Sequence, residues 1–313
     1  MEQITNSIQN FYAHGKLLIS GEYLVIRGAK ALAVPLNFGQ SLQIVSANGE
    51  PKLIWRANFT GNKWFEATFN TSDFEIQETD NFELACRLRN MLQHARIMGP
   101  LFLAQPAMIT ATSSLGFPPE WGIGSGSSLM ANIGRWAKID PFELNHRIFG
   151  GSGYDVAAAL SDKPIVYNLD NGLPVYGSID FSPSFAPNLY FVYLNRKQNS
   201  KNAVQNFTNT AVSEATIEAI SEISMKMALT DSFDEFSSLM EKHEQIISDV
   251  IQQKTVKKQC FPDYKGCIKS LGAWGGDFVL AASDLGNEYV TKYFTQKGFP
   301  TLFVWDEIVL GKR

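Results

Sequence analysis

The chain has 313 residues, of which 45% are hydrophobic and 19% are charged, and its formal net charge is −4. This composition is typical of a soluble globular protein, and the length suffices for a sizeable core in two domains of ordinary size. The negative charge argues against nucleic acid as the main partner. No apolar run approaches the roughly 20 residues of a membrane-spanning helix, so we expect no membrane partner.

The cysteines and the first residues predict a compartment. Cys86, Cys260 and Cys267 are odd in number and form no C-x-x-C pair, so neither a disulfide framework nor a zinc site is expected. Residues 1–10 are polar and lack the apolar core of a secretory signal. Reduced thiols without such a signal predict a cytoplasmic protein.

The first half of the chain is predicted to be rich in strands, with helices inserted between them. Strands are expected over residues 11–19, 31–36, 41–45, 52–55, 63–69 and 107–111. An apolar period of 3.6 residues predicts a helix over residues 81–98, and shorter helices are expected over 128–137, 141–149 and 154–160. Asp140 is a natural N-cap for the helix that starts at Pro141.

The second half is predicted to mix both kinds of element. A hairpin is expected over residues 164–176, and strands are expected over 189–194, 278–282 and 301–305. Helices are expected within 201–253 and over 265–271 and 287–296. A Pro- and Ser-rich stretch over 182–187 predicts a domain boundary, which divides the chain into 1–182 and 183–313. Such a pattern favours an α+β fold over a doubly wound sheet.

A glycine- and serine-rich stretch, Pro118-Pro-Glu-Trp-Gly-Ile-Gly-Ser-Gly-Ser-Ser128, precedes one predicted helix. Glycines let backbone amides approach a ligand, and a helix start adds unpaired donors and a positive dipole end, so the stretch could bind phosphate. It lacks the Lys of a Walker A loop, the spacing of a dinucleotide fingerprint and a nucleophile elbow. The alternative interpretation is a flexible turn that caps a helix.

Two further glycine-containing blocks flank this loop along the chain. One is His14-Gly-Lys-Leu-Leu-Ile-Ser-Gly-Glu-Tyr-Leu-Val-Ile-Arg-Gly28, and the other is Ser270-Leu-Gly-Ala-Trp-Gly-Gly-Asp-Phe-Val-Leu-Ala281. The order and spacing of the three blocks resemble the GHMP kinase superfamily, most closely its mevalonate and phosphomevalonate kinase branch. The run Gly151-Ser-Gly-Tyr-Asp-Val-Ala157 is similar to the segment that holds the catalytic Asp in that branch.

This resemblance implies a two-domain α+β fold. The N-terminal domain would contain a left-handed βαβ crossover, the phosphate loop and the catalytic residues, and the C-terminal domain would be ferredoxin-like. It also implies ATP and Mg²⁺ as cofactors. The residues implied to bind the nucleotide are Gly122, Gly124, Ser125, Gly126, Ser127 and Ser128.

The resemblance assigns catalytic roles to two residues. Asp155 resembles the base that accepts the substrate proton, and its alternative role is that of a carboxylate at a helix start. Lys16 resembles the strand lysine that pairs with this Asp and faces the transferring phosphate, and its alternative role is that of a surface lysine. A lysine in an apolar strand needs a charged partner.

Further positions are implied on the substrate and metal sides. Substrate contacts are expected from His14, Glu22, Tyr23, Gly275 and Gly276, with a structural role open for His14 and Glu22. Metal ligands are expected among Ser125, Ser127 and Glu143, because Gly126 replaces the second Ser of the family's G-L-G-S-S motif. Glu143 requires a one-residue gap to match the family's Glu, and it is an equally good helix cap.

The sequence therefore predicts a kinase that transfers the γ-phosphoryl group of ATP to a small alcohol or phosphate. We expect a monomer or homodimer whose partners are ATP and the acceptor, and the sequence does not name that acceptor. One alternative is an enzyme similar to mevalonate diphosphate decarboxylase. The other is a nucleotide- or metabolite-binding protein that has lost catalysis.

Overall fold

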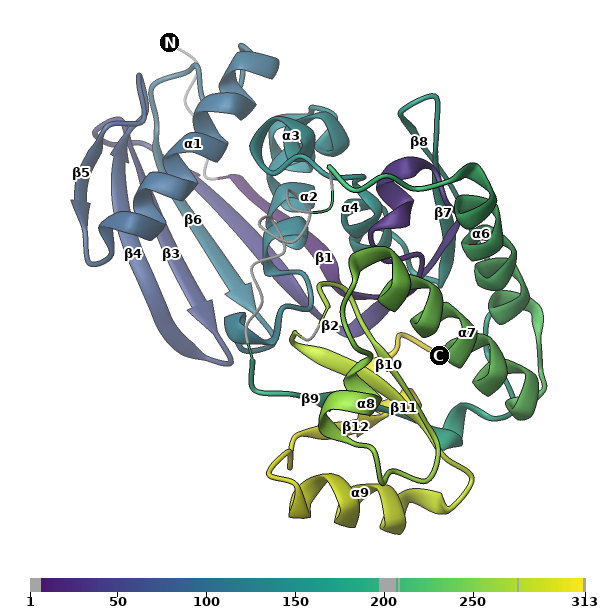
Figure 1. Ribbon diagram of the computed structural model, residues 1–313. Coiled ribbons are helices and arrows are strands. Elements are labelled where there is room, and N and C mark those ends of the chain that lie inside the picture. The colour runs from purple at the N-terminus through teal and green to yellow at the C-terminus, as the bar shows by residue number, and fades with distance from the viewer. Residues whose placement is uncertain (1–6, 197–206, 208, 275, 312–313) are drawn as a thin grey trace. The chain divides into compact units, whose positions relative to one another are not determined.

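A computed structural model describes residues 7–196, 207, 209–274 and 276–311, and it has the mixed α+β architecture expected from the sequence (Figure 1). The chain forms two compact units that interleave along the sequence. The first comprises Met1–Gly15, Phe38–Pro119 and Gly124–Leu160, and the second comprises Lys16–Asn37, Glu120–Ile123 and Ser161–Arg313. The division of the chain at residue 182 stays a prediction.

The first unit is built on a mixed sheet, which contains both antiparallel and parallel strand pairs. Its strands come from β1 (Ser7–Ser20), β2 (Ala31–Ala47), β3 (Lys52–Phe59), β4 (Asn62–Asn70), β5 (Ile76–Thr79) and β6 (Met108–Leu115). The strand order is β5-β4-β3-β6-β2, and β3 pairs in parallel with β6 but antiparallel with β4. Buried residues alternate with half-buried or exposed ones along β3 and β4, as expected when one face of a sheet is covered.

Helix α1 (Phe82–Met98) covers one face of this sheet (Figure 1). The Asn81 side chain accepts the Leu84 amide and thereby caps the helix start. Ala85, Leu88 and Leu92 repeat on one helix face and pack into the same buried cluster as Trp55 of β3. The helix predicted over residues 81–98 is therefore present.

Three shorter helices complete the first unit: α2 (Ser125–Ala137), α3 (Pro141–Ile148) and α4 (Tyr154–Leu160). Asp140 caps α3 by accepting the Phe142 amide, as its position in the sequence predicts. A Cβ atom on Gly134 of α2 would lie 2.8 Å from Pro141, so glycine permits the close approach of α2 and α3. α2 starts three residues earlier than predicted, because the loop serines already form its first turn.

The second unit contains two groups of strands. The start of β2 pairs with β7 (Ile165–Asp170), which forms a hairpin with β8 (Leu173–Ser178). A smaller antiparallel sheet has the order β10-β11-β9-β12, formed by Cys267–Ser270, Phe278–Ala282, Leu189–Tyr193 and Leu302–Val304. The predicted α+β fold is thus confirmed, and the structure shows that it includes a second, small sheet.

Helices pack around the small sheet. α8 (Val256–Cys260) and α9 (Gly286–Gln296) share a buried cluster with its strands that includes Phe261 and Phe294. Among the described residues the remaining helices are α6 (Glu214–Leu229), α7 (Phe233–Ile251), α10 (Trp305–Ile308) and the 3₁₀ turns Leu24–Arg27, Pro119–Trp121 and Ala186–Asn188. The part of the predicted helical region over 201–206 lies outside the described residues.

One predicted element is wrong. Residues 265–271 were expected to form a helix, but Cys267–Ser270 is strand β10, paired with β11. Three of its four side chains are fully buried, including Lys269. Pairing inside a covered sheet overrides the local helical pattern here. Strand β5 and helices α8 and α10 were not predicted, and the two strands predicted over 31–36 and 41–45 are one continuous strand, β2.

Candidate active site

The start of the glycine loop is fixed to the second unit. The backbone amide of Lys16 donates a 2.8 Å hydrogen bond to the carbonyl of Ile123, whose side chain is fully buried. The Tyr193 hydroxyl donates to the Glu120 carbonyl at 3.2 Å. The Trp121 ring lies 5.3 Å from the Phe303 ring, in an aromatic cluster. Residues 120–123 are therefore held rigidly beside the strand that carries Lys16.

Position 122 requires glycine for two reasons, its backbone conformation and the lack of room for a side chain. Its φ of +67° lies in the left-handed region, and a Cβ atom there would lie 1.8 Å from Oδ2 of Asp277. Asp277 directly follows the last glycine of the third block, and no role was predicted for it. Its position after a glycine run was the one available signal.

In the first unit the loop continues into helix α2. Gly124 is the N-cap with a φ of +106°, and no side chain among the described residues caps this end. The amides of the first turn therefore meet the requirement for an anion site, reinforced by the helix dipole. Ser125 and Gly126 are half-buried, so this turn is accessible.

The three loop serines differ in environment. Ser128 is fully buried, and its hydroxyl donates to Oε1 of Gln40 at 2.8 Å. The hydroxyl of the buried Ser127 donates to the Gly124 carbonyl at 3.1 Å. Ser125 is the most accessible of the three hydroxyls for a ligand.

Asp155 lies in the first turn of α4, after Gly153, whose φ is +82°. The carboxylate is half-buried, and its Oδ1 accepts the Val156 amide at 3.1 Å. Ala159 of the same helix packs with Ala131 of α2, so the two helices that carry predicted site residues contact each other within the first unit.

Lys16 is half-buried on β1 between the buried residues Gly15 and Leu17. It belongs to the second unit, whereas Asp155 belongs to the first. The pairing of Lys16 with Asp155 therefore stays a prediction. His14 is half-buried on the same strand, with its ring edge-on to Tyr12 at 5.1 Å.

The predicted substrate-side residues have unequal surroundings. Glu22 is buried and forms an ion pair with Lys269 of β10. The Tyr23 hydroxyl accepts the Trp274 amide at 2.8 Å, and the Gly276 amide donates to the Ala273 carbonyl at 3.1 Å. Gly275 lies outside the described residues.

The predicted metal ligands can be compared with what Mg²⁺ requires. Glu143 forms an exposed ion pair with Arg147 at 2.7 Å, and Asp140 rather than Glu143 caps the helix. Within the described part of the chain, no group of three or more His, Cys, Asp or Glu could hold a metal. Mg²⁺ in kinases is commonly held by one or two carboxylates together with substrate phosphates and water, and a phosphate loop can add a Ser or Thr hydroxyl. The hydroxyls of Ser125 and Ser127 are of the second kind.

A buried polar cluster lies beside the first block, and the sequence analysis missed its other members. His243 and Glu244 of α7 are buried with Glu22 and Lys269. Burial raises the pKa of the Glu22 carboxyl, although Lys269 opposes this, and it lowers the pKa of His243 well below its usual value. Burial also raises the pKa of Glu244 to about 7, despite Lys269 and two hydrogen bonds from Ser270.

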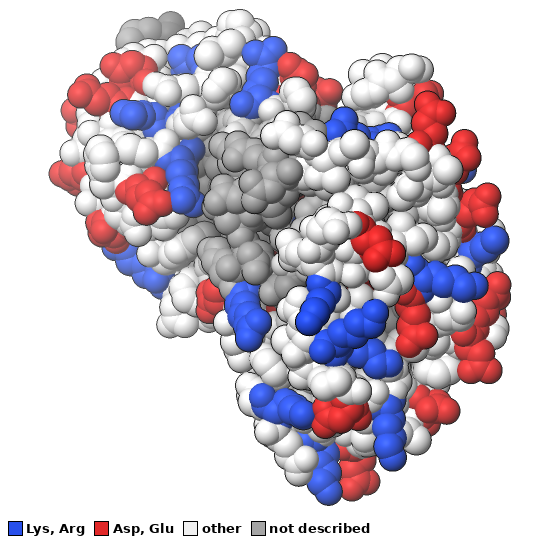
Figure 2. All heavy atoms as spheres, viewed as in Figure 1, with Lys and Arg blue, Asp and Glu red and all other residues white. Residues whose placement is uncertain are grey.

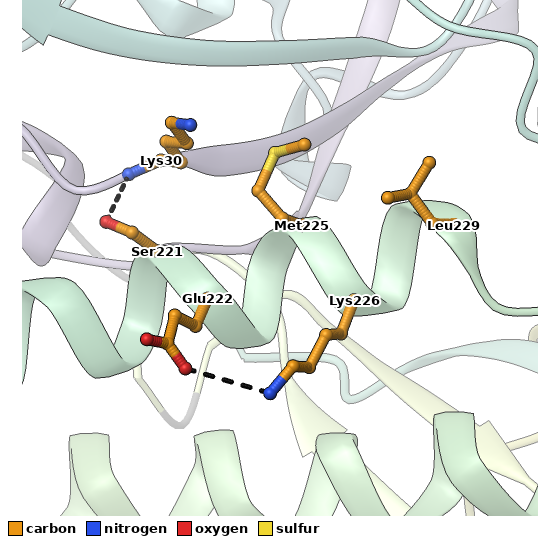
Figure 3. A pocket seen from close by; sticks show the side chains of 6 residues that line it. All are labelled: Lys30, Ser221, Glu222, Met225, Lys226 and Leu229. Atoms are coloured by element: carbon orange, nitrogen blue, oxygen red, sulfur yellow. Dashed lines mark hydrogen bonds and ion pairs between the residues drawn. The ribbon is translucent and has the colours of Figure 1, made fainter.

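The surface shows lysines and arginines interspersed with acidic residues (Figure 2). A separate open pocket lies on α6 in the second unit, lined by Lys30, Ser221, Glu222, Met225, Lys226 and Leu229 (Figure 3). Its Glu222–Lys226 pair is 3.7 Å apart. None of these residues belongs to the three glycine blocks. Among the described residues no helix is long and apolar enough to cross a bilayer.

The fold can be compared with solved structures. Mevalonate kinase from Methanococcus jannaschii matches with a TM-score of 0.67 and 14% identity, over 95% of this chain and 97% of that one. Phosphomevalonate kinase from Streptococcus pneumoniae, in complex with phosphomevalonate and AMPPNP, matches with a TM-score of 0.67 and 13% identity, over 94% and 99%. Galactokinase from Lactococcus lactis, complexed with galactose, matches with a TM-score of 0.69 and 11% identity, over 95% and 93%.

No protein-family model and no curated protein sequence matches the chain. At 11–14% identity these matches show that the chain shares the fold of the compared kinases, which is the fold that the resemblance in the sequence implied. The matches extend over nearly the full length of each compared kinase.

Proposed function

We propose that this protein is an ATP- and Mg²⁺-dependent kinase that phosphorylates a small alcohol or a phosphate group. The observation that carries the proposal is the hydrogen bond from the Lys16 amide to the Ile123 carbonyl. It ties the predicted catalytic strand to the residue that directly precedes the N-cap of α2. The fold supports the same conclusion, because the compared structures with this fold are small-molecule kinases.

The first step is binding of the triphosphate. Amides of residues 122–127 would hold the phosphate oxygens at the start of α2, where the helix dipole favours negative charge. The Ser128 amide already donates to the Gly124 carbonyl at 3.0 Å. The Lys16 ammonium would face the γ-phosphoryl group and offset its charge. The hydroxyls of Ser125 or Ser127, with Glu143 as the proposed carboxylate, would hold Mg²⁺, which when bound would further neutralise the phosphates.

The second step is transfer. The acceptor oxygen attacks the γ-phosphorus, the bond between this phosphorus and the β,γ-bridging oxygen breaks, and ADP leaves. The Asp155 carboxylate accepts the proton of the acceptor hydroxyl, an effect worth roughly 10²–10⁴-fold in rate. For a phosphate acceptor, which is already ionised, Asp155 would instead orient the attacking oxygen.

The acceptor is proposed only as a class. The compared kinases were crystallised with phosphomevalonate and with galactose, so a small polar alcohol or phosphate is the range to test. The proposed acceptor contacts are His14, Tyr23, Gly275 and Gly276. Glu22 would support this region without touching the acceptor. A cytoplasmic monomer or homodimer remains the expectation.

An ADP-release assay over a panel of such acceptors tests the proposal. We expect turnover with at least one acceptor, and loss of about 10²-fold or more in Asp155→Asn. Asp80→Asn, which removes an exposed carboxylate paired with Lys63 on the same unit, is the matched control. Tight ATP binding without turnover on any acceptor would instead establish a binding protein, and release of CO₂ would establish a decarboxylase.

A further inference from the structure

The turn after β1 is attached to the rest of the second unit at four consecutive residues. The Ser20 hydroxyl donates to the hydroxyl of Ser224 on α6 at 2.8 Å, and the Gly21 amide donates to Nε2 of His243 on α7 at 2.9 Å. Glu22 pairs with Lys269 on β10, and the Tyr23 hydroxyl accepts the Trp274 amide at 2.8 Å. Four separate segments of the chain thus hold one turn.

The conformation of this turn needs such support. Tyr23 has a φ of +61°, which is strained for a residue with a side chain. Gly21 has a φ of +92°, and a Cβ atom there would lie 2.6 Å from Ala31. Strained conformations of this kind persist only where surrounding contacts over-determine them.

Lys269 is the central contact of the arrangement. Its Nζ lies against Oε1 of Glu22 and donates to the Ser270 carbonyl at 2.9 Å, and the Lys269 and Glu22 side chains are each 1% exposed. Oε2 of Glu22 lies 3.3 Å from Nε2 of His243. Because that nitrogen accepts the Gly21 amide, the imidazole is neutral, and Lys269 is the one cation facing Glu22 and Glu244 among the described residues.

A buried ion pair is a poor source of stability compared with well-packed apolar side chains, because both charges lose their hydration. Its effect on geometry is more specific, since the pair fixes the position of the segment that carries Glu22. That segment continues β1 directly, and Lys16 lies four residues before Ser20 on the same strand.

We propose that Lys269 is a positioning residue, which holds the turn over residues 20–23 through Glu22 and thereby fixes Lys16 and Tyr23 for phosphoryl transfer. The kinetic consequence rests on the proposed function. The structural consequence, order in the turn, does not. Neither residue of the ion pair touches the acceptor or nucleotide in this account.

Hydrogen–deuterium exchange of the amides of residues 20–23 tests the structural part. In Lys269→Met we expect exchange in this turn to accelerate about 10-fold or more, with the amides of α9 unchanged. Lys297→Met is the matched control, because Lys297 is an exposed lysine of the same unit that pairs with Asp263 at 3.0 Å. Unchanged exchange in the turn, or equal acceleration throughout the unit, would overturn the proposal.

Should Lys269→Met fail to fold, Glu22→Gln removes the same ion pair with little change in shape and is judged by the same criterion. The double variant Glu22→Gln/Lys269→Met removes both charges of the pair, and at pH 6 the neighbouring Glu244 carboxyl is protonated, so overall stability should recover at that pH while the turn stays mobile. Recovery of both stability and turn protection would mean that the pair is dispensable for positioning.

Kinetics then separates this inference from the proposed function. A displacement of about 1 Å in a reacting group can cost roughly 10²-fold, so Lys269→Met should lower kcat far more than it raises the KM for ATP. Lys269→Arg should restore part of the rate. A wild-type protein without turnover on any acceptor refutes the proposed function, and the exchange result still decides the positioning role.

Discussion

The backbone amide of Lys16 and the carbonyl of Ile123 are joined by a hydrogen bond of 2.8 Å. Strand β1 is thereby fixed next to the residue at which the glycine loop begins to form helix α2. In the proposed kinase, this bond sets where the Lys16 side chain leaves the strand. The bond involves only backbone atoms, so it survives substitution of the Lys16 side chain.

Lys16→Met should therefore separate chemistry from folding. We expect a loss of about 10²-fold or more in kcat/KM, because one positive charge no longer offsets the transferring phosphoryl group. The melting temperature should change little, since the backbone contact remains. Steady-state ADP release and thermal unfolding measure the two effects. Lys63→Met removes an exposed lysine and should change neither activity nor fold. Full activity in Lys16→Met would remove Lys16 from the mechanism.

Gly122 and Gly126 form a matched pair of glycines in one loop. Gly122→Ala should destabilise the protein by about 1–3 kcal/mol, because φ is +67° and the new Cβ would overlap Asp277. Gly126→Ala should be tolerated, since its Cβ would make only a 3.6 Å contact with Phe149. Denaturant unfolding of both variants measures the difference. Equal stability of the two would contradict the geometry of the loop.

Substitution of Ser128 should lower the stability of the fold, whereas substitution of Ser125 should weaken nucleotide binding. Ser128→Ala leaves the buried Gln40 side chain without its 2.8 Å donor, so a loss of about 1–3 kcal/mol in unfolding free energy is expected. Ser125→Ala should leave stability unchanged and weaken binding of the Mg²⁺–nucleotide complex. Calorimetric titration with AMPPNP in the presence and absence of Mg²⁺ measures the second effect. A Ser125→Ala variant with unaltered Mg²⁺ dependence would exclude this hydroxyl as a ligand.

Much of this architecture could be predicted from the sequence, and the failures have physical causes. Local apolar periodicity predicts the strands of the first half and helix α1, and capping chemistry predicts the cap at Asp140. Both signals are contained in short stretches of sequence. Strand β10 could not be predicted, because its burial depends on pairing with β11. Glu22 and Lys269, which form the buried ion pair, are 247 positions apart, so no local sequence pattern indicates their contact. The glycine blocks identified candidate residues, whereas the pairing of Lys16 with Asp155 stays a prediction.

Stability should depend on pH through Glu244. Its folded-state pKa of about 7 lies above the ordinary value of 4.5, so the carboxyl contributes stability below pH 4.5 that is lost as the pH rises through 7. Between pH 6 and 8 the wild type should lose about 1 kcal/mol more than Glu244→Gln, which does not titrate. Urea unfolding at the two pH values measures this difference.

His243 contributes a pH dependence of stability with the opposite sign. Its folded-state pKa lies well below 6.5, so its contribution is present above pH 6.5 and is lost as the pH falls. Between about pH 4.5 and 6.5 the two dependences offset each other, so the two groups together predict maximal stability of this cluster at mildly acidic pH. A wild type and a Glu244→Gln variant with parallel pH profiles would contradict the burial of the Glu244 carboxylate.

The position of a bound nucleotide relative to Lys16 and Asp155 tests the central claim most directly. A crystal structure with AMPPNP, Mg²⁺ and an acceptor from the turnover panel provides it. We predict that the triphosphate contacts the amides at the start of α2, and that the Lys16 ammonium and the Asp155 carboxylate both lie within about 6 Å of the γ-phosphate. A triphosphate bound away from the glycine loop, or an Asp155 carboxylate remote from the γ-phosphate, would contradict the account.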